Sequence, residues 1–374
     1  MFNTSDISKN SYMLEGSLAR KGYDRWWHSF TGIDEETGEE KSFFVEFFII
    51  NPKKSINRPM FGSWNEEPSY LMVKAGCCGK NHVELNRFFP LSCVHIASGA
   101  PFSIGAADCF CSEDRLRGSV MISGDDVNMH PEYMSGSGAM SWKLKIKKEI
   151  AFNVGYATSF LFRKIKAFEM YWHAEGMKTS YEGEVFLGGR RYIVNKENCY
   201  GYADKNWGRN FTSPWIWLSS NDLYSKKYNK KLENSVFDIG WCRPKVYFIP
   251  FNKKLLGAIY YEGREFEYNF SKFWHKSKIT FDCKALNDRV VWNIVLENKK
   301  SKAIVNVECL KDEMLLINYE APDGVKRHKN LYNGGTGYGA IKLYEKNKNN
   351  LTLIDEIECK HVGCEYGEHD EEKK

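Results

Sequence analysis

The sequence lacks the long apolar segments of a membrane protein. None of its 374 residues belongs to an uninterrupted apolar run near the roughly 18 residues that a spanning helix needs. Its first residues, Met1–Asp6, also lack the basic segment followed by an apolar segment that is typical of a secretory signal. We therefore expect a cytoplasmic protein without a membrane span.

Paired cysteines of the kind that bind zinc are missing as well. None of the 11 cysteines forms a CxxC pair, and only Cys77-Cys78 and the pair Cys109 and Cys111 lie close together in the sequence. In a reducing compartment, scattered cysteines within apolar strands serve as small buried side chains. We therefore predict free thiols and no metal site.

Familiar catalytic motifs are also absent. The sequence contains neither an HExxH motif nor a GxSxG motif. The glycine-rich segment Gly334–Gly339 precedes a strand-like segment, Ala340–Tyr344, whereas a phosphate-binding loop needs a helix N-terminus behind it. We predict a mobile hairpin or an edge loop at these glycines.

The charge pattern argues against a nucleic-acid partner. The net charge is only +5, and lysines are dispersed among asparagine and glutamate, as in Lys226–Lys231. Such a run is typical of a solvated loop, and no nucleic-acid-binding motif accompanies it.

Alternation of apolar and polar residues dominates the pattern. Ser141–Lys147, Glu265–Phe270 and Ala303–Cys309 alternate as half-buried strands do. Phe43–Ile50 and Val290–Leu296 are continuous apolar strands. Short strands that recur at roughly 8–12-residue spacing predict an all-β protein built as an antiparallel sandwich or barrel.

Turn residues and chain length suggest two sets of strands. Gly188-Gly189 and Glu262-Gly263 each predict a tight hairpin. The best helical pattern covers Asn153–Lys166, which we expect to be the longest helix. The 374 residues fit an N-terminal barrel over residues 1–212 and a C-terminal barrel over residues 213–374.

One segment combines ionisable side chains with aromatic rings. It is Tyr202–Gly208, which Trp215–Asn221 follows closely. On a strand, Asp204 and Asn206 share one face and Lys205 points to the other. A carboxyl group against aromatic walls has its neutral form favoured, so it can act as a general acid. The alternative is a barrel-closing corner in which Asp204 and Lys205 bind loop backbone.

Two further aromatic strands, Tyr23–Phe30 and Phe168–His173, carry one histidine each. A single histidine among rings is more often a hydrogen-bonded core residue than a catalyst, and His28 allows both interpretations. Glu46 interrupts the apolar run Phe43–Ile50. It is either a partnered carboxylate inside a barrel, or it lies on an outward face whose phenylalanines meet another domain.

These segments resemble the tocopherol cyclase-like family. Tyr202–Gly208 resembles the family's YAEKNWG motif, and Trp215–Asn221 resembles its W-x-W-x-Q-x-N segment. Tyr23–Phe30 and Ser42–Pro52 occupy the places of its aromatic N-terminal strand and of the strand that ends at Asp-Pro, and Ser141-Trp142 resembles its SW strand. The resemblance covers most of the chain in order.

The resemblance implies two lipocalin-like antiparallel β-barrels in tandem and chemistry without a cofactor. An acid would protonate a carbon–carbon double bond of an isoprenoid-like substrate, and a hydroxyl would capture the cation inside a dry, aromatic pocket. We therefore predict a cyclase or hydratase, of the isomerase or lyase class. Its partner would be a hydrophobic small molecule, collected by transient contact with a membrane.

Departures from the family pattern bear on the substrate. Asp204 replaces the family's glutamate, Ser219 replaces its glutamine, and Asp24-Arg25 replaces Glu-Gly. A hydrophobic quinol, a terpenoid and a polyene therefore stand beside a tocopherol precursor. Two other classes stay open: a carrier that binds a lipophile unchanged, and an isomerase or pericyclase that only folds its substrate.

The candidate site follows from both arguments. Asp204 is the first choice of proton donor, positioned by Lys205 and Asn206, and Glu46 is the reserve. The predicted substrate-binding residues are Trp26, Trp27, His28, Trp172, His173, Trp207, Trp215, Trp217 and Asn221.

The protonation state of Asp204 separates the alternatives. As the acid, Asp204 must be buried, so that desolvation raises its pKa. Lys205 would lower that pKa from nearby, but strand geometry should turn it to the opposite face. We also expect the strand Tyr23–Phe30 to lie close to Asp204, and activity to fall as the pH rises through the pKa of this acid.

Overall fold

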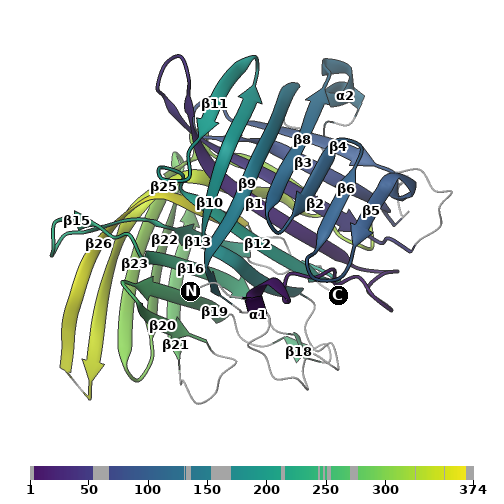
Figure 1. Cartoon of the computed structure of the whole chain (residues 1–374). Helices are drawn as coiled ribbons and strands as arrows, with labels where there is room; N and C mark the ends of the chain where they lie inside the picture. Colours follow the sequence, from purple (N-terminus) through teal and green to yellow (C-terminus); the bar gives the residue numbers. More distant parts are fainter. Residues whose placement is uncertain are drawn as a thin grey trace.

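The computed structural model describes residues 4–53, 67–129, 131, 136–152, 170–211, 215–242, 245–246, 249–250, 254–269, 277–324, 326–348 and 350–367. Most of these residues lie in antiparallel strands, which confirms the predicted all-β class. The strands form two large curved sheets, one from each half of the chain (Figure 1).

The N-terminal sheet, purple to teal in Figure 1, has twelve strands. They are β1 (Tyr23–Asp34), β2 (Glu40–Ile50), β3 (Tyr70–Cys78), β4 (Val83–Phe89), β5 (Val94–Ala97), β6 (Ser103–Ala106), β7 (Cys109–Ser112), β8 (Arg115–Ile122), β9 (Gly138–Phe152), β10 (Met170–Leu187), β11 (Arg190–Val194) and β12 (Gly201–Gly208). Their order is β4-β3-β2-β1-β11-β10-β9-β8-β7-β6-β5, and β12 pairs with both β1 and β10. Because β12 closes against β1, it lies deep inside the molecule.

The C-terminal sheet, green to yellow, also has twelve strands. They are β13 (Trp215–Ser220), β14 (Asp222–Ser225), β15 (Lys230–Lys231), β16 (Ser235–Cys242), β19 (Lys254–Tyr261), β20 (Arg264–Tyr268), β21 (Lys278–Ala285), β22 (Arg289–Glu297), β23 (Ser301–Leu310), β24 (Leu315–Glu320), β25 (Lys326–Asn347) and β26 (Asn350–Gly367). The main order is β20-β19-β16-β13-β26-β25-β23-β22-β21; β14 joins β15 and β26, and β24 joins β25. A separate two-stranded sheet pairs β17 (Lys245–Val246) with β18 (Ile249–Pro250).

Helices are short in the part of the chain that the structure describes. They are α1 (Thr4–Ile7), α2 (Gly124–Met129) and 3₁₀ turns at Leu91–Cys93 and Lys311–Glu313. The helix predicted at Asn153–Lys166 lies outside the described residues, and so does the predicted domain boundary after residue 212, which stays a prediction. Among the described helices, none has the length and apolar character to cross a membrane.

The predicted strand patterns are confirmed where the structure describes them. In β9, Trp142, Leu144 and Ile146 are buried and the lysines between them are exposed. The hairpins turn at Gly188-Gly189, between β10 and β11, and at Glu262-Gly263, between β19 and β20. Period-two alternation therefore sets which side chains enter each core.

The loop predicted at Gly334–Gly339 is wrong, because these residues lie within β25. A Cβ atom on Gly334 would lie 3.0 Å from the Cys309 sulfur, and one on Gly339 would lie 2.0 Å from the Asn306 carbonyl oxygen. The glycines thus let β23 and β26 approach β25 closely, at a place where the pairing with β26 also shifts register.

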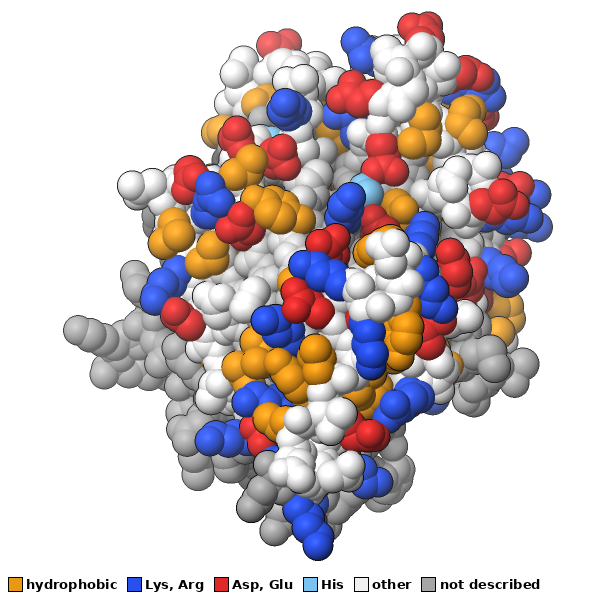
Figure 2. Space-filling view, turned by 90° about the vertical axis from the view of Figure 1, so that its left-hand side faces the viewer, with side chains coloured by type: hydrophobic (Ala, Val, Ile, Leu, Met, Phe, Trp, Pro, Cys, Tyr) orange, Lys and Arg blue, Asp and Glu red, His pale blue; other side chains and the backbone are white. Residues whose placement is uncertain are grey.

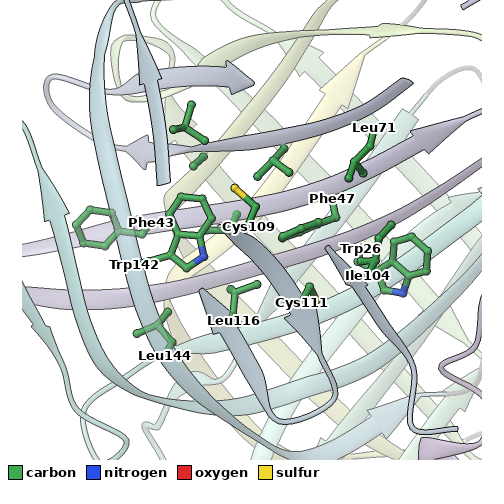
Figure 3. Close-up of a cluster of buried hydrophobic side chains, with 14 of the residues drawn as sticks. Trp26, Phe43, Phe47, Leu71, Ile104, Cys109, Cys111, Leu116, Trp142 and Leu144 are labelled. Atoms are coloured by element: carbon green, nitrogen blue, oxygen red, sulfur yellow. The ribbon is translucent and has the colours of Figure 1, made fainter. Parts of the chain in front are cut away.

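The buried hydrophobic residues form three layers. The first fills the N-terminal sheet and includes Trp26, Phe47 and Trp142 (Figure 3). The second fills the C-terminal sheet around Trp292. The third lies between the sheets, and it includes Trp27, Phe44, Phe48, Trp215, Trp217 and Tyr319.

Strands β1 and β2 separate the first layer from the third. Trp26 enters the N-terminal layer and Trp27 the layer between the sheets, because successive side chains point to opposite faces. Glu46 shares its face with Phe44 and Phe48, which pack between the sheets. The alternative that this face of β2 meets another part of the protein is therefore confirmed.

Arg25 joins the two sheets from the middle of the third layer. Its guanidinium is 3.2 Å from Glu46 of β2 and 3.5 Å from Glu365 of β26. It also lies 5.0 Å from the ring centroids of both Trp27 and Tyr319. With its side chain 3% exposed, this cation connects strands from both halves of the chain.

The outer surface is mixed in character. Figure 2 shows one face on which Lys and Arg side chains alternate with Asp and Glu and with small hydrophobic patches. On the described surface, exposed large hydrophobic side chains include Leu351 and Leu353 of β26.

We predict that Arg25→Met strongly destabilises the protein. The substitution leaves Glu46 and Glu365 buried without their cation, and breaking a buried ion pair costs roughly 3–5 kcal/mol. The free energy of unfolding, measured by urea denaturation, should fall by that amount. Arg289→Met is the matched control, because Arg289 pairs with Asp288 and Glu308 at the surface. Equal losses in both variants would contradict the role of Arg25.

Candidate active site between the two sheets

Strand β12 supplies the central residues of the candidate site. Both of its faces are buried. Tyr202 packs in the layer between the sheets and Trp207 in the N-terminal layer, so Asp204 and Asn206 share the face of Tyr202. Trp27 of β1 is the cross-strand partner of Asp204. The expected proximity of the aromatic strand to Asp204 is confirmed.

Asp204 is buried among donors and rings. Only 6% of its surface is exposed. The Trp172 indole N–H of β10 donates to its Oδ2 atom at 2.8 Å, and the Tyr202 hydroxyl lies 3.3 Å from the same atom. Among the described residues, its Oδ1 atom is buried and accepts no hydrogen bond. One carboxyl oxygen is therefore fixed while the other is left for a further partner.

Asp238, on β16 of the C-terminal sheet, lies on the other side of the Tyr202 hydroxyl from Asp204. It is completely buried. The Trp217 indole N–H donates to its Oδ1 atom at 3.0 Å, and the Tyr202 hydroxyl lies 3.1 Å from its Oδ2 atom. The sequence did not single out Asp238; its place between Phe237 and Ile239 in an apolar strand is the signal that could have found it.

Burial controls the protonation of both carboxyl groups. Desolvation raises the pKa of Asp204 to about 7, although Arg25 and the Trp172 N–H act in the opposite direction. Desolvation and the neighbouring Asp204 raise the pKa of Asp238 well above its ordinary value. At neutral pH the site therefore contains neutral carboxylic acid, as the general-acid interpretation requires.

Glycines of the C-terminal sheet hold the two indoles in place. A Cβ atom on Gly240 would lie 2.6 Å from the Trp172 ring, and one on Gly363 would lie 2.4 Å from the Trp217 ring. Both rings thus lie directly on strand backbone, where no larger residue fits. This packing fixes the N–H groups that point at the two aspartates.

A second polar cluster surrounds Arg25. The Tyr319 hydroxyl donates to Glu46 at 2.9 Å. Glu365 accepts hydrogen bonds from the Trp215 indole and from the Asn333 amide. Burial raises the pKa of Glu365, while Arg25 lowers it. Glu46 and Trp215 were among the predicted site residues, whereas Tyr319, Asn333 and Glu365 were not. Asn333 and Glu365 lie in two C-terminal segments, Tyr332–Gly334 and Val362–Glu365, that resemble the family more weakly.

Lys205 lies away from Asp204, as expected from the strand geometry. Its ammonium is 3.0 Å from Asp24 and also donates to the Ser11 carbonyl oxygen. Burial lowers the pKa of Lys205, and Asp24 opposes that effect. The Lys205 ammonium therefore contacts Asp24 and backbone of the N-terminal segment, on the face of β12 opposite Asp204.

The predicted aromatic lining divides between two layers. Trp27, Trp172, Trp215 and Trp217 lie between the sheets. Trp172 bonds Asp204 and Trp27 is its cross-strand partner, whereas Trp215 bonds Glu365. The four other ring residues lie in the interior of the N-terminal sheet, because each occupies the opposite face of its strand: Trp26, His28, His173 and Trp207.

The two histidines are core residues. The His28 ring is 2.8 Å from the Tyr181 hydroxyl and 3.3 Å from the Cys111 sulfur. Desolvation lowers the pKa of both His28 and His173 to about 3, so both rings are neutral at physiological pH. The geometry therefore places neither His28 nor His173 between the sheets.

The two predicted asparagines, Asn206 and Asn221, have different surroundings. Asn206 is buried and pairs across strands with Arg25 and Trp172. Asn221 donates to the carbonyl oxygens of Met177 and Gly201, at 3.2 and 2.7 Å. Asn221 therefore ties the C-terminal sheet to the N-terminal sheet rather than contacting Asp204.

A small cavity between the sheets is lined by residues that contact the acids rather than by the acids themselves. It has a volume of about 30 Å³, and its walls include Trp27, Phe44, Trp217 and Asn333. Trp217 separates it from Asp238, and Asn333 separates it from Glu365. This volume suits about one water molecule, so a larger ligand needs displacement of the walls.

A groove outside the cavity provides a route to it. The groove has a volume of about 520 Å³ and shares Ser42, Cys78 and His361 with the cavity walls. This volume lies in the range of small-molecule sites, roughly 300–1,000 Å³. The three shared residues mark the entrance to the space between the sheets.

His361 closes this entrance with a charged contact. Its Nδ1 atom is 2.7 Å from Asp222, and its Nε2 atom bonds Glu40 of the N-terminal sheet. Two carboxylates can bond both ring nitrogens only when each nitrogen carries a proton. Burial lowers the pKa of His361, but the two hydrogen bonds outweigh it and raise the pKa to about 9.

We predict that the contribution of His361 to stability depends on pH. Its folded pKa of about 9 exceeds the unfolded value near 6.5. The stabilisation is therefore complete below about pH 6.5 and is lost as the pH rises through about 9. His361→Asn should lower the free energy of unfolding by about 2 kcal/mol at about pH 6, and by less above pH 9.

Asparagine suits the test because the backbone of His361 has φ of 47°, a left-handed conformation that asparagine tolerates. The control is His95→Asn, at an exposed position of β5. A loss for His361→Asn that stays constant with pH would contradict the charged contact.

In the described part of the chain, no group of three or more His, Cys, Asp and Glu side chains is arranged to hold a metal ion.

Comparison with solved structures gives distant matches over nearly the whole chain. CghA is 8% identical with a TM-score of 0.50, and the match covers 94% of this chain and 90% of CghA. A putative ATTH from Nitrosomonas europaea is 12% identical, with a TM-score of 0.49 and coverage of 97% and 95%. Kievitone hydratase from Nectria haematococca is 11% identical, with a TM-score of 0.47 and coverage of 99% and 96%. The likeness to CghA shows a shared fold alone.

Sequence comparison is more specific. No curated protein matches the chain. The family model described as "Tocopherol cyclase-like" matches residues 122–368, more than half of the chain. The matched region contains both Tyr202–Gly208 and Trp215–Asn221, the segments that carry the resemblance. The chain belongs to the tocopherol cyclase-like family, with its lipocalin-like all-β fold.

Proposed function

We propose that the protein is a cofactor-free cyclase or hydratase that protonates a carbon–carbon double bond of an isoprenoid or prenylated substrate. Asp204 is the proton donor. The observation that carries this proposal is the burial of Asp204 between Trp27, Trp172 and Tyr202, with one carboxyl oxygen unbonded among the described residues. Family membership supports the reaction class.

The pKa of Asp204 suits this role. Raised by desolvation to about 7, it leaves a large fraction of the carboxyl protonated near neutral pH. A general acid works best when its pKa lies near the operating pH. Glu46 is less suited, because Arg25 and the Tyr319 hydroxyl already contact its two carboxyl oxygens.

The rings around the acid suit a cationic intermediate. The faces of Trp27, Trp172 and Trp217 lie in the layer between the sheets. A cation over a dry aromatic face gains about 2 kcal/mol or more. In a cyclisation, the proton adds to the alkene, a substrate hydroxyl attacks the cation, and the proton of that hydroxyl returns to the carboxylate. In a hydration, water takes the place of the hydroxyl.

The space between the sheets suits a hydrophobic substrate with few polar groups. We propose that it enters by the groove at Ser42, Cys78 and His361, after transient contact with a membrane in the cytoplasm. A hydroxyl or carbonyl on the substrate would first meet the amide of Asn333, which lines the cavity, and Glu365 lies behind it as a further acceptor.

Asp204→Asn is expected to lower turnover by at least about 100-fold, because general acid catalysis contributes roughly 10²–10⁴. The probes are the lipid extracted from the purified protein, identified by mass spectrometry, and a prenylated hydroquinone. In D₂O the product should gain one deuterium on carbon for each proton delivered. Binding, followed by quenching of tryptophan fluorescence, should change little, because asparagine has nearly the same shape.

Asp355→Asn is the matched control, since Asp355 is fully buried and accepts a hydrogen bond from the Tyr261 hydroxyl at 2.9 Å inside the C-terminal sheet. It should retain turnover. Full activity of Asp204→Asn would remove Asp204 from the mechanism. Release of every bound lipid unchanged by the native protein would instead favour the carrier.

A further inference from the structure

We infer that Asp204 and Asp238 hold one catalytic proton between them through the Tyr202 hydroxyl, so that Asp238 is a positioning residue that resupplies the acid. The catalytic consequence rests on the proposed function, whereas the shared proton does not. Asp204 belongs to β12 of the N-terminal sheet and Asp238 to β16 of the C-terminal sheet.

The geometry of Tyr202 carries the inference. Its hydroxyl oxygen lies 3.3 Å from Asp204 Oδ2 and 3.1 Å from Asp238 Oδ2. A phenolic hydroxyl has one proton to donate, and an ionised carboxylate only accepts. If both carboxylates were ionised, one of them would face the hydroxyl oxygen with no proton between them. Both contacts are favourable only when one carboxyl group carries a proton.

The two indoles define the direction of the chain. The Trp172 N–H donates to Asp204 Oδ2, which therefore accepts two hydrogen bonds in its ionised form. The Trp217 N–H donates to Asp238 Oδ1, which leaves Oδ2 as the oxygen that faces Tyr202. The arrangement is thus Asp238 as acid, donating to Tyr202, which donates to Asp204.

Proton transfer along this chain is balanced. The Asp238 proton passes to the Tyr202 oxygen while the hydroxyl proton of Tyr202 passes to Asp204, so the phenol is regenerated. Asp204 then gives its proton to the alkene carbon, where a C–H bond forms from the π electrons. After a C–O bond forms, the hydroxyl proton of the substrate returns to Asp204, and the reverse shift restores Asp238.

Other charges near the pair do not replace this proton. Arg25 on β1 lowers the pKa of Asp204, whereas Glu365 on β26 and Glu175 on β10 raise it. On the C-terminal side, the strands that flank Asp238 present Ser219 of β13 and Ala258 of β19 as its cross-strand partners. Tyr260 of β19 shares the face of Ala258 and is the next titratable group along that strand.

The first test needs no substrate. Protein labelled with ¹³C at the aspartate carboxyl groups is titrated in D₂O, and the infrared band of protonated aspartic acid is recorded. At about pH 8.5 Asp204 alone would be ionised, but the pair should retain one proton and its band. Asp238→Asn should remove this band, and Tyr202→Phe should shift it. A native spectrum without a band that responds to Asp238→Asn would overturn the inference.

The second test is the pH profile of turnover. With the pair intact, activity should persist well above pH 7. In Asp238→Asn and in Tyr202→Phe, activity should fall as the pH rises through about 7, the pKa of Asp204 in its buried setting. Tyr261→Phe is the matched control and should keep the native profile, because its partner Asp355 lies outside the site. Equal profiles for all four proteins would overturn the role of Asp238.

The outcomes separate this inference from the proposed function. If the native protein shows the infrared band of the shared proton but turns over no substrate, the shared proton is supported and the proposed enzyme is rejected. If the native protein lacks this band but Asp204→Asn is inactive, the proposed enzyme is supported and the shared proton is rejected. Since asparagine and phenylalanine preserve the volumes of the residues that they replace, circular dichroism and the native titration together distinguish loss of folding from loss of the proton.

Discussion

The alternation of side chains along β1 and β12 is the constraint on which the rest of the structure depends. Both strands are buried on both faces, so each residue belongs either to the interior of the N-terminal sheet or to the layer between the sheets. A shift of one residue would exchange Trp26 for Trp27 and Asp204 for Lys205. The interior of the N-terminal sheet would then receive the acid, and the layer between the sheets would receive an ammonium group. The chemistry of the site is therefore fixed by strand register before any individual contact is considered.

The same register creates an imbalance of charge. Among the described side chains, Glu46, Asp204, Asp238 and Glu365 face the layer between the sheets. Arg25 contacts Glu46 and Glu365 there, and Lys74, whose ammonium lies 4.8 Å from the Tyr319 ring centroid, is bound to Glu84. Burying carboxylates in excess of cations is costly. Burial accordingly raises the pKa of Asp204, Asp238 and Glu365, and Arg25 opposes this effect at Asp204 and Glu365.

Much of the fold could be predicted from the sequence, but less of the site. The period-two pattern in Ser141–Lys147 and the Gly-Gly turn gave correct strands, because these signals are local. The loop predicted at residues 334–339 was wrong, because these glycines allow β23 and β26 to approach β25 closely. No local pattern shows that approach. Asp204 was found from its aromatic neighbours. Asp238, Tyr319 and Glu365 come from distant strands of the C-terminal sheet, so only the packing of the two sheets brings them to the candidate site.

In the proposed function, a substrate would enter where the contacts between the sheets break at least cost. The cavity of about 30 Å³ is closed by rings on one side and by His361 at the groove. Releasing Arg25 would strand two buried carboxylates, whereas His361, Asp222 and Glu40 are 23%, 14% and 32% exposed, so water can replace their contacts. The contacts of His361 are therefore less costly to break than the ion pairs of Arg25, which keep the two sheets together. In the proposed reaction, a hydrophobic molecule that entered there would meet the rings of Trp27, Phe44 and Trp217 before the acids, an order that would protect a cation from water.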